Sequence, residues 1–223
     1  YDAVELHLQV PEDAPASEMD SLRKELGINV SAVATGLSKL VGHLDFIDDD
    51  AGIRSAAVRR VRDFVDWSAA LECGIVVGSL RGTIPDMHHR DRYDKRFQDC
   101  MKNIMDYAEE KDVPIYLEVI NRYESNYLNT AKETLEYIRT FNSDHLYVHL
   151  DTYHMNIEES SFEKAICLCG DKLGYIHFAD NNRHACGDGR LDFGEVIAAL
   201  RDISYKGYLT VECLLYPDGL TAA

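Results

Sequence analysis

Short apolar segments alternate with amphipathic segments along all 223 residues, and this alternation restricts the chain to the α/β class of folds. The amphipathic segments Ile53–Leu71 and Arg92–Lys111 have the apolar spacing of helices that bury one face. Strands that are separated by one helix each pair in parallel, with right-handed crossovers. We predict strands at Asp2–Leu8, Asn29–Ala34, Gly74–Ser79, Val113–Ile120, Leu146–Asp151, Leu173–Phe178 and Gly207–Cys213.

This strand–helix repeat predicts a (β/α)8 TIM barrel that forms a single domain over residues 1–223. Seven strands are visible where a closed barrel needs eight, and no helix follows Cys213. We therefore expect that the first βα unit and the last helix of the barrel are missing. An open doubly wound sheet is the competing architecture, but no GxGxxG motif follows the first strand. Thr130 followed by Glu133 predicts a capped helix start before Leu146.

Four acid or imidazole side chains lie at the ends of four consecutive predicted strands. The apolar runs read PIYLEV, LYVHLD, LGYIHF and YLTVEC, and the intervals of 33, 26 and 35 residues suit one strand–helix repeat each. Taken singly, each residue is equally well explained as a helix cap, a surface ion pair or a core histidine. Together they predict a divalent cation site, because the carboxyl ends of barrel strands face one mouth. The predicted ligands are Glu118, Asp151, His177 and Glu212.

The charge and cysteine content of the chain argue against several classes of function. The formal net charge is −16, which repels a phosphate backbone and disfavours nucleic acid as a partner. The six cysteines include no CxxC pair, as is typical of reduced thiols in the cytoplasm. We find no signal peptide and no apolar run of about 18 residues, the length that a membrane span needs. We therefore expect a cytoplasmic protein that acts on a small molecule and binds no membrane.

The four predicted ligands are embedded in longer polar blocks. These blocks read LEVINRYESNYLNT, HLDTYHMNIEE, YIHFADNNRHACGDG and TVECLLYPDG. In this order they resemble the xylose-isomerase-like barrel superfamily of sugar isomerases and epimerases. The similarity is greatest to the D-tagatose/D-psicose 3-epimerases and to keto-sugar-acid epimerases of the 5-keto-L-gluconate type. It begins near Ala34 and is densest from Glu118 onward.

The resemblance implies an isomerase that inverts C3 of an unphosphorylated ketose or keto-sugar acid. By matching position, the four strand-end residues bind one divalent ion, usually Mn²⁺, with Mg²⁺ or Co²⁺ as alternatives. The ion stabilises an enediolate, and Glu118 and Glu212 act as acid and base on its opposite faces. Glu124, His154 and Arg183 match substrate contacts in the family. The resemblance also implies a homodimer or homotetramer.

Several of these polar residues also have a structural interpretation. Arg81 suits a substrate carboxylate, but a structural salt bridge explains it equally well. His7 ends the first predicted strand, and we interpret it as a core histidine whose hydrogen bonds are satisfied rather than as a site residue. The structural alternatives for the three family contacts are pairs of His154 with Glu158 or Glu159, of Arg183 with Asp180, and of Glu124 with Arg122.

Three other functions fit part of the pattern. An aldose–ketose isomerase of the hydroxypyruvate or inosose isomerase type would use the same site but move the carbonyl group. An endonuclease-IV-like repair enzyme needs a trinuclear zinc cluster and a basic surface, and the net charge of −16 has the wrong sign for that surface. A sugar-binding module would keep the pocket without turnover.

Overall fold

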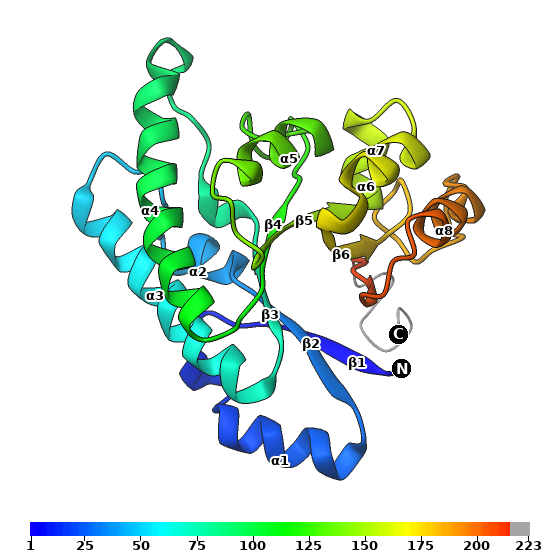
Figure 1. Ribbon diagram of the computed structural model, residues 1–223, viewed down its shortest axis with the longest axis horizontal. Helices are drawn as coiled ribbons and strands as arrows, with labels where there is room; N and C mark the ends of the chain where they lie inside the picture. The colour runs from blue at the N-terminus through cyan, green and yellow to red at the C-terminus, as the bar shows by residue number, and fades with distance from the viewer. Residues whose placement is uncertain (215–223) are drawn as a thin grey trace.

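The computed structural model describes residues 1–214, through which seven parallel strands run in sequence order. Each strand pairs with the next, and the sheet curves into a nearly closed barrel with helices on its outside (Figure 1). The TIM-barrel class and the count of seven strands are therefore confirmed. The strands are β1 (Ala3–His7), β2 (Asn29–Ala34), β3 (Gly74–Val77), β4 (Ile115–Glu118), β5 (Leu146–Asp151), β6 (Leu173–Phe178) and β7 (Leu209–Val211).

Helices connect the strands and cover the outer face of the barrel. Two of them, α3 and α4, match the predicted helices to within two residues at each end. The predicted cap is also present, because the Thr130 side chain accepts a hydrogen bond from the backbone of Glu133 and the Glu133 carboxylate accepts one from the backbone of Thr130. The helices are α1 (Ala16–Leu26), α2 (Gly36–Leu40), α3 (Ala51–Leu71), α4 (Arg90–Glu110), α5 (Ala131–Arg139), α6 (Thr152–Glu158), α7 (Phe162–Cys169) and α8 (Phe193–Asp202). In the described part of the chain, no helix combines the length and apolar character that a membrane crossing requires.

Small and aromatic side chains fill the interior of the barrel. Ala32 and Ala34 of β2 pack there with Tyr175 of β6, and Tyr116 of β4 lies against them. The rings of Tyr116 and Tyr175 stack with centroids 5.0 Å apart. Gly74 leaves room for this stack, because a Cβ at that position would lie 2.1 Å from the Tyr116 ring. The interior is therefore a packed core below the mouth and not an open pore.

One tyrosine hydroxyl links three strands across that interior. The Tyr175 hydroxyl of β6 lies 2.7 Å from the Ser31 hydroxyl of β2 and accepts a hydrogen bond of 2.7 Å from Thr210 of β7. Among residues 1–214, no backbone pairing joins β7 to β1. The Ser31 hydroxyl in turn donates to the carbonyl of Val4 on β1 at 3.1 Å, so these side chains connect the strands on either side of the opening.

Candidate metal centre and active site

The four predicted ligands meet at the carboxyl ends of β4 to β7. Glu118 ends β4, Asp151 ends β5, His177 is the penultimate residue of β6, and Glu212 directly follows β7. Asp151 and His177 are register partners in neighbouring strands. One ligand atom from each of the four residues lies within 4.8 Å of the others. A single ion placed among them is within reach of three carboxylates and one imidazole.

Glu5 of β1 is a member of this cluster that sequence reasoning missed. Its Oε2 atom accepts a hydrogen bond of 2.7 Å from Nε2 of His177, and both side chains are buried. Burial opposes protonation of His177, but the Glu5 and Glu212 carboxylates outweigh it and raise its pKa well above the usual value. When the ring gives up one proton to bind a metal, the proton that stays lies on Nε2, toward Glu5. The other ring nitrogen, Nδ1, faces Glu212 Oε2 at 3.2 Å and has no hydrogen-bond partner in the described structure. His177 thus directs Nδ1 at the cluster, the arrangement that metal-binding histidines adopt once that nitrogen is deprotonated.

The carboxylates of the cluster have strongly shifted pKa values. Burial, reinforced by the neighbouring Glu212 carboxylate, raises the pKa of Glu118 to about 8. Burial also raises the pKa of Asp151 to about 6, although the Arg183 guanidinium opposes the shift. Burial works against ionisation of Glu212 too, but His177 and Arg183 outweigh it and lower the pKa to about 2. Three carboxylates and an imidazole nitrogen directed at one another in a buried site fit a divalent cation.

Arg183 reaches the cluster from the loop after β6. Its guanidinium donates to Asp151 Oδ2 and to Glu212 Oε2, and it lies 4.7 Å from the ring centroid of Tyr153. The predicted alternative, a side-chain pair with Asp180, is not formed. The buried carboxylate of Asp180 instead organises the loop that carries Arg183, since it accepts four backbone N–H bonds of 2.8–3.2 Å. These come from Asn181, Gly187, Arg190 and Leu191.

His154 lies beside Glu118 and is oriented by Asn121, a second residue that sequence reasoning missed. The side-chain oxygen of Asn121, Oδ1, accepts a hydrogen bond of 2.9 Å from the backbone N–H of Tyr123. The side-chain nitrogen, Nδ2, is therefore the atom that donates to Nδ1 of His154 at 2.7 Å. Burial lowers the pKa of His154 to about 3, which keeps the ring neutral. The ring proton therefore lies on Nε2, 3.7 Å from Glu118 Oε1. His154 is thus a fixed hydrogen-bond donor directed at the cluster.

Glu124 lies at the rim of this site. Its carboxylate accepts a hydrogen bond of 3.0 Å from the Asn121 amide, and its side chain is 54% exposed. The predicted alternative, a pair with Arg122, is not formed because Arg122 binds Glu158 at 2.7 Å. The same contact occupies Glu158, which was a predicted structural partner for His154. The polar end of Glu124 is accordingly free to contact a ligand.

Arg81 lies on the 3₁₀ turn after β3 and is completely buried. Its Nη1 atom donates to the carbonyl of Leu128 at 3.3 Å, and its Nε and Nη2 atoms have no partner in the described residues. Burial lowers the pKa of Arg81 to about 10, although the Glu118 carboxylate opposes the shift. No carboxylate of the described chain forms a salt bridge with it, so the structural pair that we considered is not formed. A contact between Arg81 and a substrate carboxylate stays a prediction.

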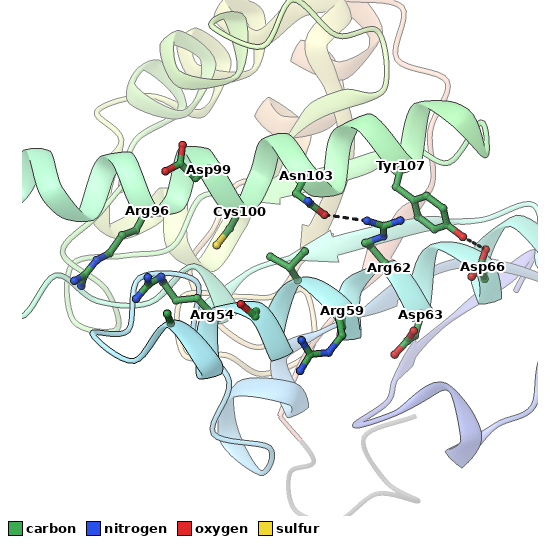
Figure 2. Close-up of a pocket in the computed structure, with 13 residues that line it drawn as sticks. Arg54, Arg59, Arg62, Asp63, Asp66, Arg96, Asp99, Cys100, Asn103 and Tyr107 are labelled. Carbon is green, nitrogen blue, oxygen red and sulfur yellow. Dashed lines mark hydrogen bonds between the residues drawn. The ribbon is translucent and has the colours of Figure 1, made fainter.

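A cavity of about 640 Å³ lies outside the barrel, between α3 and α4 (Figure 2). Two hydrogen bonds join side chains that line it. Arg62 donates to Asn103 at 3.2 Å, and the Tyr107 hydroxyl donates to Asp66 at 2.7 Å, as the dashed lines in Figure 2 show. None of the predicted site residues lines this cavity. The chemistry of the side chains therefore locates the candidate site at the barrel mouth and not in this groove.

The sequence profile of a family described as "Xylose isomerase-like TIM barrel" matches residues 1–221. The chain belongs to this family. The resemblance drawn from the polar blocks is therefore confirmed.

Its relatives within the xylose isomerase-like family are named as sugar epimerases. The L-ribulose 3-epimerase of Methylomonas sp. (strain DH-1) is 34% identical over 216 residues, which are 95% of this chain and 73% of that protein. The 3-dehydro-D-guloside 4-epimerase of Escherichia coli (strain K12) is 31% identical over 205 residues, covering 87% of this chain and 76% of that protein. A crystal structure of D-allulose 3-epimerase from Methylomonas sp. in complex with D-allulose has a TM-score of 0.85 at 30% identity, covering 98% of this chain and 75% of that chain.

Proposed function

We propose that the protein is a metal-dependent sugar epimerase that inverts C3 of an unphosphorylated ketose or keto-sugar acid. The observation that carries this proposal is the convergence of four ligand atoms within 4.8 Å at the barrel mouth. The names of the relatives support it, because ketose 3-epimerases are among the proteins that this chain matches over nearly its whole length. A homodimer or homotetramer is the assembly that we propose.

Glu118, Asp151, His177 and Glu212 would hold the divalent ion in this proposal. Mn²⁺ is our first choice, and Mg²⁺ and Co²⁺ also accept three oxygens and one nitrogen. The bound ion supplies Lewis-acid stabilisation of negative charge on the oxygens of the sugar, an effect worth several kcal/mol.

Glu118 and Glu212 perform the proton transfers. Inversion breaks the C3–H bond, the electron pair moves toward the ketone oxygen to form an enediolate, and a proton returns to C3 from the opposite face. The two carboxylates come from β4 and β7, which are three strands apart in the barrel. They are therefore the candidates to transfer protons at the two opposite faces of the enediolate. One removes the proton and the other returns it, with the roles reversed for the opposite direction.

The remaining site residues position the sugar. The Nε2–H of His154 and the guanidinium of Arg183 donate to oxygens on which negative charge develops. Glu124 accepts from a sugar hydroxyl at the rim. The fixed tautomer of His154 gives this donor its direction before the sugar arrives, so little reorganisation is needed during the reaction.

The proposal is tested with protein that has been stripped by a chelator and reloaded with Mn²⁺. D-Fructose, D-tagatose and a 5-keto-hexonate are incubated with it in D₂O, and the products are separated by chromatography and examined by NMR. We expect Mn²⁺-dependent deuterium incorporation at C3 and formation of the C3 epimer from at least one sugar. Absence of C3 exchange with all three sugars would overturn the proposal.

The aldose–ketose isomerase remains the alternative, since the same residues can move a carbonyl group. In that case the product is an aldose, which the same chromatography separates from the epimeric ketose. The match to a 3-dehydro-D-guloside 4-epimerase favours one further assay, because that enzyme's name places the inverted carbon next to a keto carbon at position 3. A 3-keto-glycoside is therefore added to the sugars tested.

A further inference from the structure

His7 closes one side of the candidate site. It is the last residue of β1 and lies on the same face of that strand as Glu5, two residues earlier. Glu5 points into the barrel, because it contacts His177 on β6. His7 therefore projects inward one layer nearer the mouth than Glu5.

The contacts of His7 place it beside the proposed acid/base residue Glu212. Its Nε2 atom lies 3.8 Å from Glu212 Oε1. The other oxygen of that carboxylate, Oε2, is occupied by the Arg183 guanidinium and faces His177 at 3.2 Å. His7 thus borders the oxygen of Glu212 that remains available for a substrate proton.

A buried carboxylate lies against the His7 ring. Nε2 of His7 lies 2.9 Å from Oε1 of Glu5, whose other oxygen binds His177. Glu5 therefore holds two imidazoles, one inside the ligand cluster and one at the mouth. Glu5 and His177 are 3% and 1% exposed, whereas the His7 side chain is 46% exposed. His7 is accordingly a half-exposed ring that contacts a buried carboxylate.

We propose that His7 is a substrate-contacting residue that binds a hydroxyl group of the sugar and helps to select which sugar is accepted. Nε2 faces Glu5, and the side chain is 46% exposed, so the other ring nitrogen, Nδ1, is the candidate to accept from or donate to a hydroxyl. A polar group fixed at that distance from Glu212 distinguishes sugars by the position and configuration of their hydroxyls. This proposal rests on the proposed sugar epimerase activity and extends it to a residue outside the predicted site.

The test compares His7→Ala and His7→Gln with wild type and with His145→Gln. His145 lies at the amino end of β5, at the opposite end of the barrel from the mouth. For each protein kcat and KM are measured with D-fructose, D-tagatose, L-ribulose and a 5-keto-hexonate, and the Kd for Mn²⁺ alone is measured by calorimetry. A thermal unfolding curve accompanies each variant.

We expect His7→Ala to raise KM about tenfold for the preferred sugar and to change the order of preference among the four. His7→Gln keeps a hydrogen-bonding group and recovers part of the loss, while kcat and the Kd for Mn²⁺ change less than threefold. His145→Gln behaves as wild type. Unchanged KM values and an unchanged order of preference in both His7 variants would overturn the proposal. So would an equal loss for all four sugars together with weaker Mn²⁺ binding, because His7 would then only support Glu5.

The design separates this proposal from the proposed function. If wild type turns over a sugar and the His7 variants match it, only the role of His7 fails. If wild type turns over none of the four, the Mn²⁺-loaded proteins are titrated with the same sugars by calorimetry. Sugar binding by wild type that His7→Ala weakens supports the His7 contact although the epimerase proposal has failed. No binding by wild type overturns both.

Discussion

Oε2 of Glu5 lies 2.7 Å from Nε2 of His177, although 172 positions separate the two residues in the sequence. Their strands, β1 and β6, do not pair with each other, so the contact crosses the barrel interior. It fixes the tautomer of His177 and directs Nδ1 toward the carboxylates of the candidate metal centre. A residue on the first strand therefore determines how a predicted ligand on the sixth is presented.

Replacement of Glu5 by Gln is expected to weaken Mn²⁺ binding about 10- to 100-fold, because a neutral amide makes the imidazole a poorer ligand and orients it less firmly. Calorimetric titration of the chelator-stripped protein measures the change. Glu18→Gln, an exposed acid on α1, serves as the matched control. A Kd within twofold of wild type would contradict the orienting role of Glu5.

Replacement of Asn121 by Ala removes the amide that donates to Nδ1 of His154. The nitrogen then keeps only the longer bond of 3.4 Å from the backbone N–H of residue 121, at a cost of about 1 kcal/mol, or the ring proton moves to Nδ1 and the donor directed at Glu118 is lost. We expect kcat/KM to fall about tenfold or more. The ¹⁵N NMR shifts of His154 report the tautomer, and Asn103→Ala on α4 is the control. A retained Nε2–H tautomer with a wild-type rate would refute the argument.

Replacement of Glu212 by Gln is expected to suppress inversion of C3 while hydrogen exchange between C3 and the solvent continues. The amide keeps an oxygen for coordination but accepts no proton, so interconversion of the C3 epimers falls by about 10²- to 10⁴-fold. One of the two epimers still exchanges its C3 hydrogen with D₂O, because Glu118 can remove and return the proton on its own face. Glu118→Gln is expected to show the converse with the other epimer. Loss of exchange with both epimers in both variants, at unchanged Mn²⁺ affinity, would argue against two separate bases.

The affinity for Mn²⁺ is expected to rise with pH between about 6 and 8. The pKa of Glu118 is about 8 and that of Asp151 about 6, so near pH 7 Glu118 holds a proton that the ion must displace. As the pH falls below 8, the protonated fraction grows and the apparent affinity drops by up to about tenfold per pH unit for each proton displaced. Calorimetry in two buffers of different ionisation enthalpy should detect about two protons released per bound ion at pH 7, one from Glu118 and one from His177, whose pKa the Glu5 and Glu212 carboxylates raise despite its burial. An affinity independent of pH across this range would contradict the assignment.

The mouth of the barrel was predictable from sequence because two regularities locate it. Parallel strands that are linked by helices all end at the same edge, and an acid or imidazole at the end of an apolar run therefore points to one place. This reasoning brought together Glu118, Asp151, His177 and Glu212, whose ligand atoms do lie within 4.8 Å of one another. Their roles in binding an ion rest on the proposal above.

Residues that act through contacts across the barrel were not predictable in the same way. Glu5 is an acid inside an apolar strand, which is an available signal, but its partner depends on which strands face each other after the barrel curves. Asn121 lies in a block that we had singled out, yet only the local turn shows that its amide orients His154. The complete burial of Arg81 depends on how the turn after β3 packs against the segment around Leu128. Neither spacing nor composition contains that information.

The hydroxyl of Tyr175, which contacts Ser31 and Thr210, has a consequence for how this enzyme family can diversify. Glu212, the proposed acid/base residue, lies two residues beyond Thr210, so a serine buried on β2 contacts, through Tyr175, the strand that carries it. On the proposed function, we expect substitutions at Ser31 to change the rate through the placement of Glu212, without altering any group proposed to meet the sugar or the ion. Members of the family could therefore differ in activity through a buried residue outside the pocket, and a comparison confined to pocket-lining positions would not include it.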